Sequence, residues 1–371
     1  MKVEFRLKQL LIQTGQDHHG IIQQISDEAH VHRHTVKRLY RNQLSRPSLE
    51  VVGKVAAWLE EHGVPARDLP QLLLGRSPAD LWRAVVAPGH VGIYLGEYEQ
   101  VDLPVGPGRW ISLHDAEVAA DLVKELTTSG RIVGDRPEVR LIYVPFRFSA
   151  TAKELLQKPC PDDITRAREL YDRMMSRGTH ETAILVGSMR VNYMVEFLVS
   201  ELFGCKPFET PKTPKVPFWL TYKPGARGIP SCFGSPKNPQ ALGPVATPGI
   251  YYLEDEDTGR WAFCEWRQKQ IDAGIVLTVR DAGTNSLVVA AFGFSGYGTE
   301  AISKELIERG SEYWGHEVVV DGRGVGVYIC RCRLRISEHS SERSHRSVEV
   351  EHADVVPLSE KVLKKRLRAR S

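Results

Sequence analysis

Residues 20–42 constrain the fold more than any other stretch of this chain of 371 residues. Two short runs of apolar residues there follow helical spacing, with Ile21 and Ile25 in the first run and Val36 and Leu39 in the second. The residues between the two runs fit a tight turn. The pattern therefore predicts two short helices that pack against each other through these apolar side chains.

The second predicted helix is basic along its outer side, which carries Arg33, His34, Lys37, Arg38 and Arg41. A helix with such a surface is suited to the major groove of DNA. The net charge of the whole chain is only +3. A nucleic-acid interaction therefore cannot be argued from the total charge and depends on where the charge lies. We place the expected DNA contact on this helix.

Two further helices are predicted around this pair. Residues 4–14 have the spacing of an amphipathic helix. Ser48 is a good N-cap for another helix, which ends at His62 and Gly63. Together the four helices predict one compact all-α bundle, which we take as a domain over residues 1–64.

This pattern resembles the phage-repressor or Xre-type helix-turn-helix family over about residues 4–64. Ile25, Ala29 and Val36 stand where that family packs its two helices together, and the segment 45–49 matches the family's exit from its recognition helix. The resemblance implies a sequence-specific transcriptional regulator that binds double-stranded DNA. It also implies a homodimer on half-sites roughly 34 Å apart.

The resemblance further implies roles for single residues. Arg33, His34 and Arg38 would read base edges, and a bidentate contact between arginine and guanine contributes about 1–3 kcal/mol of discrimination. Contacts to phosphates would fix the position of the helix without reading sequence. The expected phosphate contacts are Arg41, Asn42, Ser45 and Arg46, and Lys37 completes the expected DNA-binding set.

Two positions depart from the family pattern. His30 stands where the turn usually has glycine, and histidine is uncommon at positive φ. Ser26 replaces the usual small alanine where the helices cross. Other interpretations stay open: the basic residues could be the solvated face of an unrelated bundle, or the helices could bind a protein. The histidines nearby are interpreted as surface residues, and no metal or cofactor is expected.

Strands and helices alternate from His90 onward. Strands are predicted at 91–96, 139–145 and 182–187, each followed by a helical segment. This alternation is typical of an α/β domain with a mainly parallel sheet. We therefore predict an α/β fold overall, in which the N-terminal helix-turn-helix bundle precedes a larger α/β domain over residues 90–338.

The segments outside these two domains have distinct compositions. Residues 65–89 are predicted to be a loosely packed connector, and residues 207–250 a long proline-rich insertion. Residues 339–371 are predicted to be a polar tail that becomes basic. Its last part, residues 361–370, is interpreted as a solvated terminal helix in preference to a phosphate-binding segment.

Glycine-rich junctions follow two of the predicted strands. Glycines at the carboxyl end of a strand let backbone N–H groups approach a ligand at the start of a helix. Two such junctions in one sheet could line one crevice for a small polar or nucleotide-like ligand, or a partner protein. Alternatively, the glycines only allow tight turns. The candidate ligand-binding residues are Gly187, Ser188, Asn192, Gly293, Ser295, Gly296, Gly298 and Thr299.

An enzyme is the alternative from another class. The segment from Gly293 through Ser295 to Tyr297 resembles a nucleophile elbow, which would have a second glycine at the place of Tyr297. No Asp and His partners fall at convincing strand ends, so no catalytic residue is assigned and an enzyme is the less favoured class. An enzyme acting on a nucleotide-like ligand, or an interaction scaffold, stays open beside the regulator.

The cysteines and apolar runs bear on the cellular location. Six cysteines are scattered without a Cys-x-x-Cys motif, and Cys330 and Cys332 should point to one face of a strand. We interpret them as buried, inert thiols. The sequence has no signal-peptide pattern and no apolar run long enough to cross a bilayer. A cytoplasmic location, with no membrane partner, is expected.

Overall fold

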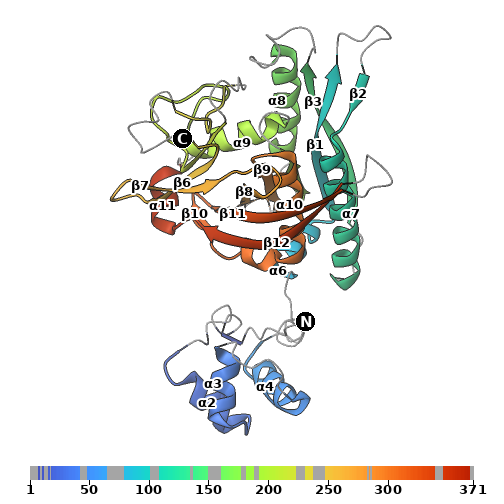
Figure 1. Cartoon of the computed structure of the whole chain (residues 1–371). Coiled ribbons are helices and arrows are strands. Elements are labelled where there is room, and N and C mark those ends of the chain that lie inside the picture. Colours follow the sequence, from blue (N-terminus) through green and yellow to red (C-terminus); the bar gives the residue numbers. More distant parts are fainter. Residues whose placement is uncertain are drawn as a thin grey trace. The chain divides into compact units, whose positions relative to one another are not determined.

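The computed structural model divides the chain into two compact units, Met1–Ala79 and Asp80–Ser371 (Figure 1). The structure describes residues 7, 8, 11, 16, 18–41, 48–64, 79–100, 108–133, 137–148, 160–176, 181–187, 192–222, 230–236, 247–281, 284, 286–338 and 346–367.

The N-terminal unit contains helices α2 (Ile21–Glu28), α3 (Arg33–Tyr40) and α4 (Leu49–Glu61). Ser48 caps α4 as predicted, because its Oγ accepts a hydrogen bond from the N–H of Val51 at 3.3 Å. The predicted first helix lies largely outside the described residues, so the complete bundle stays a prediction. The buried apolar cluster of this unit comprises Leu7, Leu11, Ile21, Ile25, Ala29, Val31, Val36, Leu39, Val52, Val55, Trp58, Leu59 and Val64.

The second unit is built on a large mixed sheet. Its strand order is β10-β11-β8-β9-β4-β1-β2, with β3 also paired to β1 and β12 to β11. The strands are β1 (His90–Gln100), β2 (Gly108–Trp110), β3 (Glu138–Phe148), β4 (Glu181–Val186), β8 (Ile271–Asp281), β9 (Ser286–Gly293), β10 (Val318–Val320), β11 (Arg323–Glu338) and β12 (Arg346–Pro357).

The prediction of a mainly parallel sheet was wrong. Only the pairs β1–β3, β1–β4 and β4–β9 are parallel, whereas β1–β2, β8–β9, β8–β11, β10–β11 and β11–β12 are antiparallel. A parallel pair needs a long crossover, and the short segment between Asp281 and Ser286 can only form a hairpin. The α/β alternation of the first half therefore gives way to antiparallel pairing in the second half.

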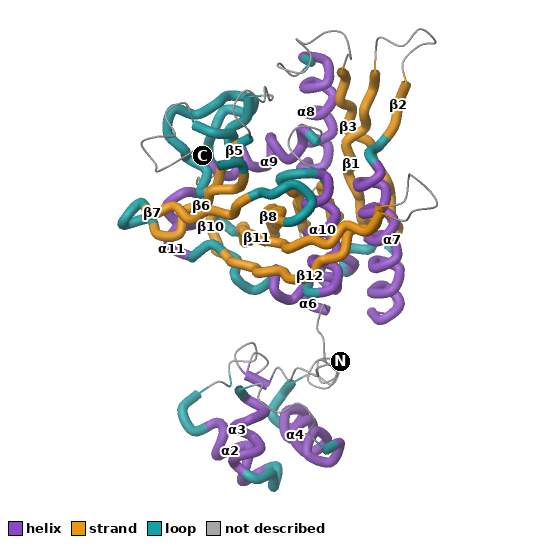
Figure 2. Tube along the Cα trace, viewed as in Figure 1, coloured by secondary structure: helices purple, strands orange, loops and turns teal. Residues whose placement is uncertain are grey.

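Helices cover both faces of the sheet (Figures 1 and 2). On one face, α6 (Ala79–Val86), α7 (Leu113–Val133) and α10 (Gly296–Glu308) pack around a buried cluster that includes Trp82, Leu122 and Ile302. On the other face, α8 (Pro161–Ser176) and α9 (Tyr193–Phe203) pack around a second cluster. Strands β4 and β9, the central parallel pair, are buried along nearly their whole length.

Three segments fold differently from their predictions. The end of the predicted connector forms α6, whose Leu81, Trp82 and Val85 are buried. The proline-rich insertion contributes strand β5 (Phe218–Thr221) to a small antiparallel sheet with β6 (Gly249–Asp255) and β7 (Arg260–Glu265). The predicted polar tail contributes β12, which pairs antiparallel with β11.

The basic C-terminal helix α11 (Glu360–Arg366) is not simply solvated. Lys361 and Lys365 both pair with Asp257, the latter at 2.9 Å, and Arg366 pairs with Glu256 at 2.7 Å. Val362 and Leu363 are buried. Acidic residues of the turn between β6 and β7 therefore neutralise much of the charge of this helix.

Cys330 and Cys332 point to one face of β11, as predicted, with their sulfurs 3.5 Å apart and both side chains buried. The hydrogen bond with the Cys330 thiol, and then burial, raise the pKa of Cys332, which is consistent with an unreactive thiol. Among the described helices, none is long and apolar enough to cross a membrane.

Candidate nucleic-acid interface and strand–helix junctions

The turn between α2 and α3 uses both residues at which the sequence departs from the helix-turn-helix pattern. His30 has a φ of 49°, in the left-handed region that favours glycine. The Ser26 hydroxyl donates to the carbonyl of Val31 at 2.8 Å, and the Val31 N–H donates to the Ser26 carbonyl at 3.1 Å. Ser26 thus bridges the turn. His32 then caps α3 by accepting from the N–H of His34.

The two sides of α3 differ sharply in composition. Val36 and Leu39 are buried in the apolar cluster of the N-terminal unit. The side chains expected to contact DNA from this helix are all exposed, and α3 contains no acidic residue. These exposed residues are Arg33, His34, Lys37, Arg38 and Arg41. The other three expected DNA contacts, Asn42, Ser45 and Arg46, lie outside the described residues.

The positive charge of α3 is largely uncompensated within the described part of the chain. Arg33, Lys37 and Arg41 form no ion pair with a described residue. They stand four positions apart, so they follow one side of the helix. A row of unpaired cations is the surface that attracts phosphate groups.

Sequence reasoning missed a hollow of about 540 Å³ next to this row. It is lined by His18, His19, Gly20, Ile21, Ile22, Gln23, Arg33 and Tyr40. Helix α2 begins here at Gly20, whose φ is 95° and which offers no side-chain cap. The hollow thus combines the start of a helix, which carries partial positive charge, with the guanidinium of Arg33. The lack of a capping side chain before Ile21 was the available signal.

In the second unit, the two glycine-rich junctions lie side by side. Strands β4 and β9 pair in parallel, so their carboxyl ends meet at one edge of the sheet. The N–H of Gly187 donates to the carbonyl of Ala291 at 3.3 Å. The topology therefore brings together the two groups of candidate ligand-binding residues. Ser188 lies outside the described residues.

The glycines of the second junction allow α10 to approach the sheet closely. A Cβ on Gly293 would lie 2.2 Å from the backbone N of Thr299, and a Cβ on Gly298 would lie 2.3 Å from Oδ1 of Asp272. The Thr299 hydroxyl accepts from the N–H of Gly293 and donates to the Ser295 carbonyl. These contacts give the glycines a packing role.

A buried carboxylate already occupies the start of α10. Asp272, on β8, is 1% exposed and accepts hydrogen bonds from the Ser295 hydroxyl at 2.5 Å and from the N–H of Ala273 at 2.8 Å. Burial raises its pKa to about 6, although the hydrogen bond from Ser295 acts in the opposite direction. This internal anion stands where a ligand phosphate would bind, which disfavours a phosphate at this junction.

The first junction is likewise satisfied from within. Asn192 is buried and caps α9 by accepting from the N–H of Met194. Its amide nitrogen donates to the carbonyls of Tyr94 and Val186, each at 3.0 Å. These bonds tie the middle of β1 to the carboxyl end of β4. The amide is therefore used by the fold and not held in reserve for a ligand.

Sequence reasoning also missed the residues that α7 brings to these junctions. His114 Nδ1 lies 2.7 Å from Oε2 of Glu300, and its ring packs against Tyr297 at 4.5 Å. A Cβ on the exposed Gly296 would approach the His114 ring within 2.7 Å. Asp115 is buried beside Gly187, and burial raises its pKa. No regular spacing links these residues to the strands, so only the fold could bring them here.

The cluster does not have the arrangement of a hydrolase or a metal centre. Ser295 is extended, with φ −124° and ψ 175°, and caps α10 while bonding to Asp272. A nucleophile elbow instead places its serine on a sharp, strained turn. Among the described residues, no group of His, Cys, Asp and Glu side chains could hold a metal ion.

Comparison with known proteins gives no relative for this chain. No protein family, no curated protein and no solved structure matches it.

Proposed function

We propose that α2 and α3 form a helix-turn-helix reading head for double-stranded DNA, and that the protein is a sequence-specific transcriptional regulator. One observation carries the proposal. Helix α3 buries Val36 and Leu39, while its other side, together with the C-cap residue Arg41, exposes five basic residues and no acidic one. A short helix held by an apolar stripe, with its charge directed outward, is the form in which a protein presents a helix to the major groove. Such a role implies a cytoplasmic location.

The proposed contacts divide by position on α3. Arg33, His34 and Arg38 would read base edges at the start of the helix. Lys37 and Arg41 would bind phosphates. The hollow between the start of α2 and Arg33 is suited to a further phosphate, because the positive end of the α2 helix dipole attracts anions.

Selection of bound sequences from a random duplex pool, followed by binding assays on the selected duplex, tests the proposal. The variant Arg33→Ala with Arg38→Ala should lose at least 30-fold in affinity for the selected duplex. Each bidentate base contact contributes about 1–3 kcal/mol of discrimination. For a Lys37→Ala variant, the slope of log affinity against log salt concentration should also become shallower, by about the contribution of one phosphate contact.

The matched control removes two exposed lysines elsewhere. Lys54→Ala with Lys124→Ala changes the net charge by the same amount, and these residues lie on α4 and α7. This control should leave affinity for the selected duplex within about twofold, because a lost surface charge outside the contact acts only through screened attraction. A wild-type protein that shows no salt-sensitive binding to any duplex, or a control as weak as the double arginine variant, would contradict the proposal.

We further propose that the α/β unit senses a ligand or partner and so regulates the reading head. The adjacency of the two strand–helix junctions supports a ligand site there. The buried carboxylate of Asp115 beside Gly187 favours a polar ligand that donates hydrogen bonds over one that presents phosphates. Spermidine should therefore raise the melting temperature of the α/β unit more than ATP does, and Asp115→Asn should reduce the difference. A larger shift with ATP would contradict this choice of ligand.

A further inference from the structure

The outer edge of β3 is the free end of the parallel part of the sheet. Strand β3 pairs with β1 along its whole length, and no described residue pairs with its other edge. Helix α8 runs beside it (Figure 1). An exposed strand edge is a template for a further strand.

Two hydrogen bonds show which backbone groups face outward. The N–H of Glu138 donates to the carbonyl of Gly89, just before β1, at 2.8 Å. The N–H of Arg147 donates away from β1, to Oδ2 of Asp163 on α8, at 2.7 Å. Backbone groups of successive strand residues point to alternate sides. The residues between them with odd numbers therefore direct their N–H and C=O groups outward.

The outward groups are open over a limited window. Pro145 has no N–H, and Asp163 already accepts the N–H of Arg147. No described residue bonds the outward backbone groups of Val139, Leu141 and Tyr143. A strand added to this edge could therefore pair with residues 139–143, with Leu141 at the centre.

The side chains of this window are apolar except for Arg140, which is exposed and pairs with Glu138 at 2.8 Å. Leu141 and Tyr143 are each 44% exposed, and Val139 packs partly against the cluster beneath α7. Natural edge strands are usually protected by lysines, prolines or bulges. Here Pro145 lies outside the window, and the charged Arg140 points to the opposite face of the strand from Val139, Leu141 and Tyr143. The apolar window is therefore expected to be covered.

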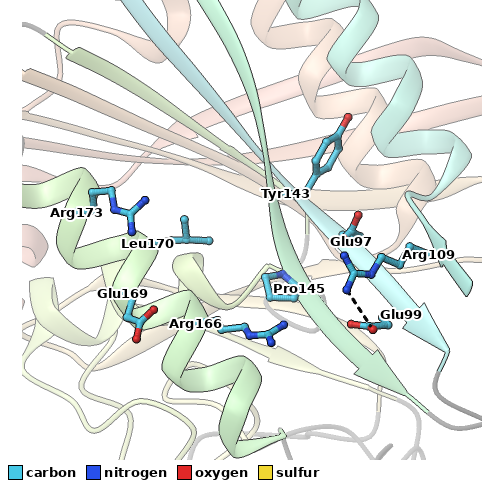
Figure 3. Close-up of a pocket in the computed structure, with 9 residues that line it drawn as sticks. All are labelled: Glu97, Glu99, Arg109, Tyr143, Pro145, Arg166, Glu169, Leu170 and Arg173. Carbon is cyan, nitrogen blue, oxygen red and sulfur yellow. Dashed lines mark hydrogen bonds and ion pairs between the residues drawn. The ribbon is translucent and has the colours of Figure 1, made fainter. Parts of the chain in front are cut away.

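The charges around the edge are balanced in sign. A hollow of about 300 Å³ lies between α8 and strands β1, β2 and β3, and it receives side chains from both sides of β3 (Figure 3). Its charged residues are Arg109, Arg166, Arg173, Glu97, Glu99 and Glu169. Of these, Arg109 lies 3.4 Å from Glu99, while Arg166, Arg173, Glu97 and Glu169 form no ion pair with a described residue. A strongly acidic or basic partner would leave one sign unpaired, whereas a second copy of this patch can pair both.

We propose that the occupant of the β3 edge is a second copy of this chain, which pairs antiparallel to β3 about a two-fold axis at Leu141. In this register Leu141 lies opposite the partner's Leu141, and Val139 lies opposite the partner's Tyr143. The apolar side chains meet apolar side chains, and all outward groups of the window form hydrogen bonds. The two sheets become one continuous sheet.

This inference goes beyond the proposed function and does not depend on it, because it rests on the α/β unit alone. If both hold, pairing through β3 joins two reading heads into one molecule. Because the dimer is measured without DNA, failure of one proposal can be told apart from failure of the other.

The test measures the mass of the full chain in solution and the register of the contact. Wild type should sediment as a dimer at about 10 μM, and Leu141→Lys should weaken association by at least 100-fold, because it buries a charge at the axis. Under mild oxidation, Leu141→Cys should form a crosslinked dimer. Opposite residues of a hydrogen-bonded pair lie about 5.5 Å apart at Cα, within disulfide range.

The matched control for crosslinking is Val319→Cys. Val319 is 70% exposed on β10, another edge of the same sheet. It should crosslink no more than wild type. In addition, a mixture of the Val139→Cys and Tyr143→Cys variants should crosslink more than either variant alone, because these positions face each other in the proposed register.

Three outcomes would overturn the proposal. The first is a wild-type monomer at about 100 μM. The second is a dimer that crosslinks no better through Leu141→Cys than through Val319→Cys, which keeps the test valid even where Leu141→Lys fails to fold. The third is a monomer whose Leu141 N–H exchanges slowly only after an extended peptide is added, which would assign this edge to a different partner.

Discussion

Helices α3 and α10 differ in whether the charged groups beside them have partners within the described part of the protein. Helix α3 exposes Arg33, Lys37 and Arg41 without an ion pair to a described residue. At the start of α10, the carboxylate of Asp272 is buried and hydrogen-bonded by Ser295. Helix α11 resembles α10 in this respect, since its Arg366 and Lys365 are paired with acidic residues.

The contrast indicates which helix has charges that an external ligand could balance. Unpaired charges cost nothing to a fold while they stay in water, so a helix can keep them for an external partner. A buried charge must be satisfied by the protein itself. The buried polar groups at the start of α10 therefore bond within the protein, whereas α3 leaves its charges in water, where we propose that a phosphate backbone binds.

The largest expected effect on stability is at Gly293, where α10 packs closest to the sheet. Gly293→Ala should lower the free energy of unfolding of the α/β unit by about 3 kcal/mol, because the new Cβ would meet the backbone of α10, which cannot rotate away. Urea unfolding followed by tryptophan fluorescence measures the change.

Gly324→Ala is the matched control within the same sheet. Its Cβ would meet only Glu317, at an ordinary 3.5 Å, and its stability should change by less than about 0.5 kcal/mol. Equal losses in both variants would show that α10 does not depend on the close approach at Gly293.

The buried carboxylate should make stability fall with rising pH. The pKa of Asp272 is about 6 in the fold against 3.8 as its ordinary value. Between these values the folded chain binds more protons than the unfolded chain. The contribution of Asp272 is therefore fully present below about pH 4 and is lost as the pH rises through 6, by up to about 3 kcal/mol.

Asp272→Asn removes this titration and retains a polar side chain of similar size. The difference in unfolding free energy between wild type and the variant, measured from pH 4 to pH 7.5, should move in favour of the variant as the pH rises. A difference that stays constant over this range would mean that the Asp272 carboxyl does not titrate in the window stated.

The smallest expected effect on stability is at the turn between α2 and α3, in the proposed reading head. His30→Gly should stabilise the N-terminal unit by about 1 kcal/mol, because φ of 49° strains a residue that carries a Cβ. Gly63→Ala, at a φ of 85° with free space around it, should lose a similar amount. Thermal unfolding measures both. A destabilised His30→Gly protein would indicate that the imidazole itself supports the turn.

Some features of the fold could be predicted because they depend on local spacing. The helical spacing of apolar residues predicts that Ile21, Ile25, Val36 and Leu39 are buried in the N-terminal unit. The capping preference of serine predicts that α4 begins after Ser48. Strict alternation places Cys330 and Cys332 on one face of β11. Each of these depends on residues within a few positions of one another, where helix and strand geometry leave little choice.

The sheet could not be predicted in the same way. Residues 346–357 alternate weakly and become a strand only because β11 offers an edge. Strand β8 runs antiparallel to β9 because the two strands form a hairpin. The apolar sequences of both strands would fit a parallel pair equally well. Asn192 and Thr299 carry the hydrogen-bonding side chains expected of ligand-binding residues. In the fold, however, these side chains form hydrogen bonds with backbone groups of the protein itself.

The sequence by itself determined the basic outer side of α3, because charge and helical period are both local. Only the tertiary structure decided that Asp272 fills the start of α10 and that His114 stands beside Tyr297. It also decided that β3 ends the sheet with Leu141 exposed. These features join residues far apart in the chain, and which distant groups meet is set by the packing of the whole core.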